Sequence, residues 1–192
     1  MGSILEALSP EQQIACSTQN NILLTACPGS GKTRTLTHRL AYQVLRDPAS
    51  KKIKIAITYT NRAAEEITNR LEGMNIDQSS IWAGTIHQFC MHFIIRPYAM
   101  YSKRLCKGYR IIDDYSKKAY GREIAERLGM HLNYYDDPFQ YENVRTEYKR
   151  VLKEKKEIDF DAILLISEEL LASCAFIGSN IASVISSILV DE

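Results

Sequence analysis

Apolar and polar residues change their spacing several times along the chain, and each change predicts a structural element. Residues 21–26 form a short apolar run followed by Pro-Gly-Ser-Gly, which predicts a buried strand. Residues 52–59 alternate polar with apolar side chains, which predicts a second strand with its isoleucines on one face. Further short strands are predicted at residues 81–84 and 188–190.

Helical patterns separate these strands. The run Ser9-Pro10-Glu11-Gln12 predicts the start of a helix, with serine as the N-cap and proline in the first turn. Alternating strands and helices are typical of a parallel sheet with right-handed crossovers, so the chain is predicted to have an α/β fold. The other predicted helices cover residues 32–45, 62–72, 85–96, 115–128, 139–155 and 159–171.

The character of the sequence changes after Pro97. Residues 98–156 are dense in tyrosine and charge, and strand signals are nearly absent there, which predicts a helical insertion within an α/β domain. The predicted division is therefore a core segment at residues 1–97, an inserted helical subdomain at 98–156, and a return to the core at 157–192.

The amino-acid composition is that of a globular protein, but it excludes few classes of function. Of the 192 residues, 45% are apolar and 24% charged, and the formal charge of +1 neither requires nor excludes a nucleic-acid partner. The five cysteines are scattered without a Cys-x-x-Cys pair, which is typical of a reducing compartment. Because no apolar run approaches the roughly 18 residues of a membrane span, we expect a soluble cytoplasmic protein without a membrane partner.

A phosphate-binding motif is the strongest chemical signal. "ACPGSGKT", from Ala26 to Thr33, fills a Walker A frame with alanine in place of the usual leading glycine. Its glycines allow a tight turn whose backbone N–H groups can face phosphate oxygens, and the next helix offers its positive end. Lys32 would reach the β- and γ-phosphates of a bound nucleotide, and Thr33 would ligate Mg²⁺. The candidate nucleotide-binding residues of this stretch are Ala26, Cys27, Pro28, Gly29, Ser30, Gly31, Lys32, Thr33 and Arg34.

The sequence "ILVDE" supplies a complementary pair of acids. Asp191 is predicted to hold Mg²⁺ together with Thr33, and Glu192 to orient or deprotonate an attacking water. Two acids after a strand are by themselves a common solvated edge, and only the Walker A motif favours the catalytic interpretation. The predicted catalytic residues are therefore Lys32, Asp191 and Glu192.

Four more stretches occur around these motifs in a fixed order: "LSPEQQIA", "ITYTNRAAEEI", "WAGTIHQFC" and "DFDAIL". As an ordered set they resemble the UvrD/Rep family of superfamily-1 DNA helicases, from Leu8 to Glu192. The resemblance implies a RecA-like P-loop NTPase sheet, here an incomplete first motor domain, with a helical insertion like that family's 1B subdomain. It also implies an ATP-dependent DNA helicase or translocase with 3′-to-5′ polarity.

The resemblance assigns roles to further residues. Gln12 matches the glutamine that hydrogen-bonds the adenine edge, although it could equally complete a capping box with Ser9. Tyr59 matches an aromatic residue that stacks on a base of single-stranded DNA, the alternative being a half-buried tyrosine at a strand end. The other residues implied to face DNA are Thr60, Asn61, Arg62, Thr85 and His87.

One basic segment lies outside these motifs. Residues 96–110 interleave five Lys or Arg residues with tyrosines, a composition suited to nucleic acid. A solvated surface is the equal alternative.

The chain also departs from the family pattern. The insertion looks shorter than in better-known members, and the sequence stops at the acid pair, before the arginines that stabilise transition-state charge. We therefore expect an N-terminal part of a longer helicase, inactive alone, acting on single-stranded DNA or a single-strand/duplex junction. The alternatives are a P-loop small-molecule kinase and a nucleotide-gated interaction module, such as a partner subunit of a repair or anti-phage system that binds another protein without unwinding DNA.

Overall fold

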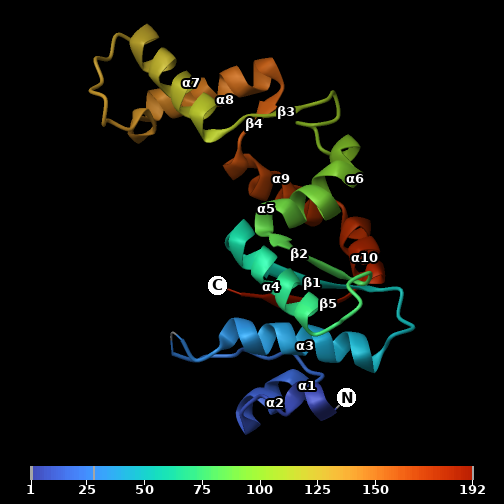
Figure 1. Cartoon of the computed structure of the whole chain (residues 1–192). Coiled ribbons are helices and arrows are strands. Elements are labelled where there is room, and N and C mark those ends of the chain that lie inside the picture. Colours follow the sequence, from blue (N-terminus) through green and yellow to red (C-terminus); the bar gives the residue numbers. More distant parts are fainter. Residues whose placement is uncertain (1, 28, 192) are drawn as a thin grey trace. The chain divides into compact units, whose positions relative to one another are not determined.

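The computed structural model describes residues 2–27 and 29–191, and the chain divides into two compact units (Figure 1). The first unit contains residues 1–89 together with 179–192, and the second contains residues 90–178. Two predicted site residues, Pro28 and Glu192, lie outside the described residues.

A parallel sheet forms the centre of the first unit. Strand β1 (Ile53–Thr58) pairs in parallel with β2 (Ile81–Thr85) on one side and with β5 (Ile185–Val190) on the other. This confirms the predicted parallel sheet and mixed α/β fold. Since parallel strands run in one direction, all three end at the same edge of the sheet.

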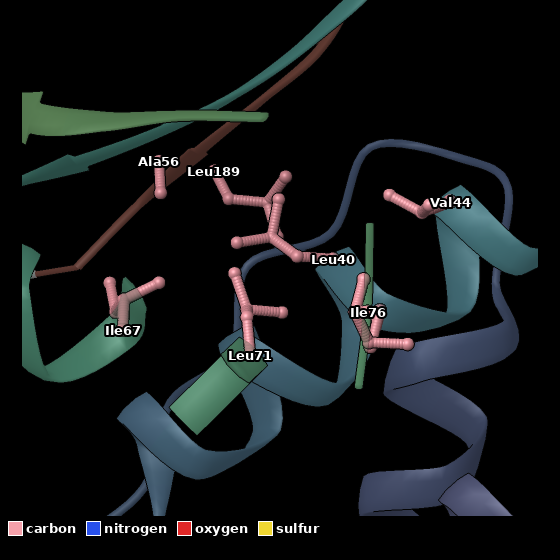
Figure 2. Packing of buried hydrophobic residues seen from close by; sticks show 8 residues of the cluster. Leu40, Val44, Ala56, Ile67, Leu71, Ile76 and Leu189 are labelled. Carbon is pink, nitrogen blue, oxygen red and sulfur yellow. The ribbon is translucent and has the colours of Figure 1, made fainter. Parts of the chain in front are cut away.

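Two amphipathic helices cover one face of this sheet. In α3 (Lys32–Arg46) and α4 (Asn61–Gly73), the buried apolar residues recur at helical spacing, so each helix has one apolar face. Figure 2 shows how Leu40 of α3 and Ile67 and Leu71 of α4 pack against the strand residues Ala56 and Leu189. The other helices that lie wholly in the described part of this unit are α1 (Gly2–Leu5), α2 (Pro10–Ser17) and α5 (Ile86–Phe89).

The prediction of a strand at residues 21–26 is wrong. The segment has no regular secondary structure, and Figure 1 draws it as a loop between α2 and α3. Its side chains are exposed, with Leu23 at 89%. A strand needs a neighbour to satisfy its backbone hydrogen bonds, and an apolar run cannot reveal whether the chain reaches one. In the described part of the chain, β5 therefore remains an edge strand.

The second unit is mainly helical. A π-helical turn (Cys90–Ile95) leads into α6 (Arg96–Tyr98) and a 3₁₀ turn (Ala99–Tyr101). Helices α7 (Asp114–Arg127) and α8 (Glu142–Lys155) follow, with a 3₁₀ turn (Pro138–Gln140) between them, and then α9 (Phe160–Ser173). The helices predicted here are confirmed within a few residues. Helix α10 (Ala175–Val184), which was not predicted, continues from this unit into the first.

A small cluster and a short strand pair hold the helical region together. Ile124 of α7 packs with Val144, Tyr148 and Leu152 of α8 in a buried cluster. Strands β3 (Arg110–Ile111) and β4 (Glu157–Ile158) pair in parallel, and the Arg110 guanidinium forms an ion pair with the buried Glu157 carboxylate. No helix within the described residues is long and apolar enough to cross a membrane.

Candidate nucleotide and DNA site

The glycine-rich loop ends in a helix terminus that has no side-chain cap. Gly29 and Gly31 have φ angles of 79° and 89°, in the left-handed region that favours glycine. Gly31 is the N-cap of α3, and because glycine has no side chain, no side-chain hydrogen bond caps the helix. The positive end of the α3 dipole therefore lies at the glycine-rich loop, as in other phosphate-binding loops.

Thr33 and Asp191 meet at this loop. The Thr33 hydroxyl donates a hydrogen bond of 2.7 Å to Oδ2 of Asp191, across 158 residues of sequence. Asp191 follows β5 directly, and its backbone N–H donates to the carbonyl of Ile57 in β1 at 2.8 Å. The sheet therefore fixes the backbone of Asp191, while the first turn of α3 positions the hydroxyl.

Lys32 lies against the loop itself. Its ammonium donates a hydrogen bond of 3.2 Å to the carbonyl oxygen of Ala26, at the other end of the turn. The loop thus carries a cation beside the N-terminal end of a helix, which suits a polyphosphate.

A hydroxyl and a carboxylate are ligands that Mg²⁺ accepts, since it prefers oxygen ligands and usually keeps several waters. Among residues 2–27 and 29–191, no group of three His, Cys, Asp or Glu side chains could hold a metal ion. The Thr33 hydroxyl and the Asp191 carboxylate fit a Mg²⁺ that takes its other ligands from a nucleotide and from water.

Gln12 connects α2 to the loop. Its side-chain oxygen accepts from the Ser9 backbone N–H at 3.1 Å, which completes the capping box. Its amide nitrogen also donates to the carbonyl of Ser30 at 3.1 Å. The capping-box interpretation is thus confirmed, and the same side chain contacts the phosphate loop. Arg34 instead donates from its guanidinium to the carbonyl of Ala7 at 2.9 Å.

Cys16 packs α2 against α3. Its thiol is 1% exposed and donates to the carbonyl of Thr35 at 3.4 Å. Burial raises the pKa of this thiol to about 11, because a thiolate would lose its hydration. Cys27 in the loop is exposed.

The predicted DNA-facing residues begin where β1 and β2 end. Tyr59 follows β1 and is 83% exposed, which contradicts the alternative of a half-buried tyrosine. The Thr60 hydroxyl accepts from the Ala63 N–H at 3.2 Å and so caps α4, leaving Asn61 and Arg62 exposed in its first turn. Because Thr85 lies opposite Thr58 in the sheet register, it lies at the same edge, and His87 is two residues farther on.

Two residues that support this edge were missed in the sequence analysis. The Gln88 side chain accepts from the Thr85 N–H at 2.8 Å, while the Gln88 N–H donates to the Thr85 hydroxyl at 3.3 Å. This is a capping box, and the spacing Thr-x-x-Gln was its signal. A Cβ on Gly84 would lie 2.6 Å from the Trp82 ring and 2.8 Å from the Gln88 side chain, so a larger residue there would displace both side chains.

Comparison with known proteins identifies similar sequences. A family model described as the UvrD/REP helicase N-terminal domain matches residues 8–137. The chain is 39% identical over 98 residues to the ATP-dependent DNA helicase PcrA of Staphylococcus aureus (strain Mu50 / ATCC 700699), a match covering 50% of this chain and 13% of PcrA. Against PcrA of Bacillus subtilis (strain 168), the identity is 40% over 95 residues, covering 48% of this chain and 13% of PcrA.

A longer match is to DNA helicase II of Escherichia coli (strain K12). It is 25% identical over 218 residues, which cover 98% of this chain and 30% of the relative. The chain therefore spans less than a third of the length of these three relatives.

Proposed function

The chain belongs to the UvrD/REP helicase N-terminal domain family, and from this membership we propose that it is the ATP-binding part of a DNA helicase or translocase. The longer protein would couple ATP hydrolysis to movement on single-stranded DNA, with 3′-to-5′ polarity. The proposal includes a RecA-like arrangement of the first unit and a helical insertion at residues 98–156.

In this proposal the residues of the phosphate loop and of the acid pair have the following roles. The backbone N–H groups around Gly29 and Gly31 bind phosphate oxygens, and the Lys32 ammonium neutralises their charge. Thr33 and Asp191 hold Mg²⁺ through oxygen ligands, and Glu192 orients the attacking water. ATP supplies the phosphoryl bond whose hydrolysis would drive movement. The observation that carries this proposal is the hydrogen bond of 2.7 Å between Thr33 and Asp191.

The DNA would run along the edge where β1 and β2 end. Tyr59 offers an exposed aromatic ring for base stacking, and Arg62 offers a cation to the phosphate backbone. Both lie at the carboxyl edge of the sheet that also carries Asp191. Nucleotide and DNA would therefore bind at the ends of the paired strands β5 and β1. A change at the nucleotide site could then alter the contacts with DNA.

Nucleotide binding tests the first part of the proposal. Fluorescence titration with a mant-ATP analogue and Mg²⁺ should give saturable binding, and Lys32→Ala should weaken it about tenfold or more through loss of a charge-assisted contact. Lys51→Ala, at an exposed lysine outside the loop, is the matched control and should bind like the wild type. Absence of wild-type binding up to about 1 mM, the upper end of ordinary substrate affinities, would contradict the proposal.

DNA binding tests the second part. Tyr59→Ala should weaken binding of a labelled oligothymidine by about fivefold or more, the effect of losing one base–aromatic stack. Tyr115→Ala removes a tyrosine that is equally exposed, at 83%, and should have no effect. We further propose that this chain alone binds ATP and DNA without useful turnover; robust DNA-stimulated ATP hydrolysis by the 192-residue chain would disprove that point.

A further inference from the structure

Three aromatic rings form a cluster in the second unit, and none of them belongs to the sequence motifs discussed above. Tyr101 contacts Phe176 at a ring-centroid distance of 5.0 Å, and Tyr98 contacts both rings at 6.4 and 6.0 Å. Tyr101 is 57% exposed and Phe176 41% exposed. Ile177, which follows Phe176 in the sequence, is fully buried. Tyr98 is half-buried, so the rings of Tyr101 and Phe176 form the exposed part of the cluster.

Cations follow these rings along the chain in a compact series of turns. Ser102 N–H donates to the carbonyl of Ala99, and Leu105 and Cys106 N–H groups donate to the carbonyl of Ser102. With Ser102 and Leu105 buried, the side chains between and after them are directed outward. The exposed cations of these turns are Lys103, Arg104 and Lys107.

The chain segment that carries these cations holds charges of one sign. Residues 96–110 contain five Lys or Arg residues and no Asp or Glu. Arg110 pairs with Glu157, whereas none of Arg96, Lys103, Arg104 or Lys107 forms an ion pair with any described residue. The Lys156 ammonium adds a further cation, since it donates to the carbonyl of Lys107 at 3.4 Å. A solvated surface usually mixes both signs, so this unpaired positive charge indicates a polyanionic partner.

We propose that Tyr98, Tyr101, Phe176, Lys103, Arg104 and Lys107, here called the aromatic–basic surface, form a second binding surface for single-stranded DNA. Exposed rings stack on unpaired bases, and neighbouring cations neutralise the backbone phosphates, which is how proteins bind single strands without sequence preference. This inference rests on the proposed function for the identity of the polymer, and it adds a contact outside the strand-end residues Tyr59 and Arg62.

Fluorescence anisotropy with labelled dT20 and with a blunt duplex of the same length tests the surface in the 192-residue chain. Tyr101→Ala/Phe176→Ala should weaken dT20 binding about fivefold or more and leave duplex binding unchanged, because paired bases cannot stack on the rings. Lys103→Ala/Arg104→Ala should weaken binding of both DNAs. It should also reduce the slope of log affinity against log salt for dT20 by about 1.4, since two phosphate contacts are lost.

Matched control variants distinguish an effect of the aromatic–basic surface from the effect of removing any exposed ring or any exposed lysine. Tyr134→Ala/Tyr135→Ala removes another contacting pair of exposed rings, and Lys118→Ala/Lys149→Ala removes two exposed lysines elsewhere in the same unit. Both should bind dT20 like the wild type. Retention of mant-ATP binding and of the circular-dichroism melting curve would show that each variant is folded.

Two outcomes would overturn the inference. One is unchanged dT20 binding in both surface variants while Tyr59→Ala weakens it, which would leave the proposed function intact. The other is equal loss of single-strand and duplex binding in Tyr101→Ala/Phe176→Ala, which would show that the rings do not stack on bases. Failure of the proposed function itself would appear separately, as absence of wild-type mant-ATP binding.

Discussion

The hydroxyl of Thr33 donates a hydrogen bond of 2.7 Å to the carboxylate of Asp191, which joins the start of α3 to the end of β5. The contact is tertiary, because 158 residues separate its partners. It places a hydroxyl and a carboxylate, the proposed Mg²⁺ ligands, side by side next to a loop that carries an ammonium group. The first prediction follows from this pair.

Removing either ligand should make nucleotide binding less dependent on Mg²⁺. Thr33→Ala and Asp191→Asn should each weaken binding of mant-ATP with Mg²⁺ by about tenfold, the cost of losing a contact to a charged group. The effect should disappear in EDTA. Thr33→Ser keeps the hydroxyl and should behave like the wild type. Equal weakening with and without Mg²⁺ would contradict a metal-binding role for the pair.

Cys27 provides a chemical probe of the phosphate loop. It is exposed, so its thiol should react readily with DTNB at pH 8, whereas the buried thiols of Cys16 and Cys90 have raised pKa values and should react only on unfolding. Mg-ATP should slow the reaction of Cys27 by covering the loop. The Lys32→Ala variant should lose this protection, and protection that persists in it would place the nucleotide elsewhere.

The correction at residues 21–26 can be tested by stability. Leu40 is fully buried in the core shown in Figure 2, so Leu40→Ala should lower the free energy of unfolding by about 2–5 kcal/mol. Leu23 is 89% exposed, so Leu23→Ala should change it by less than about 0.5 kcal/mol. Urea denaturation measures both. If Leu23→Ala lowered the free energy of unfolding as much as Leu40→Ala does, the predicted buried strand at residues 21–26 would be supported after all.

Stability should also fall in alkali because of Cys16. Folding raises the pKa of its thiol from an ordinary 9.0 to about 11, so the unfolded chain loses this proton first as pH rises. The contribution of the buried thiol is therefore complete below pH 9 and is lost as pH rises from 9 to about 11. Cys16→Ser keeps a hydrogen-bond donor for Thr35 and cannot titrate in this range. Denaturation at several pH values should show a smaller alkaline loss in Cys16→Ser, and parallel curves would contradict the assignment.

The local sequence determined much of this protein. Apolar residues at helical spacing predict α3 and α4 because a helix repeats every 3.6 residues, and Ser9-Pro10-Glu11-Gln12 predicts the cap of α2 because capping needs only neighbours in sequence. The family is likewise readable from ordered motifs and agrees with the family-model match over residues 8–137. These features depend on residues that are close together in the sequence, so they can be recognised without knowing the tertiary contacts.

Tertiary structure alone decided the rest. Residues 21–26 have the composition of a strand, but a strand forms only where another strand accepts its hydrogen bonds, and the chain does not bring one to them. The cluster of Tyr98, Tyr101 and Phe176 unites residues from α6, a 3₁₀ turn and the unpredicted α10. The meeting of Thr33 with Asp191 depends on where the sheet places β5. Local periodicity predicts elements, whereas contacts between distant segments depend on how those elements pack.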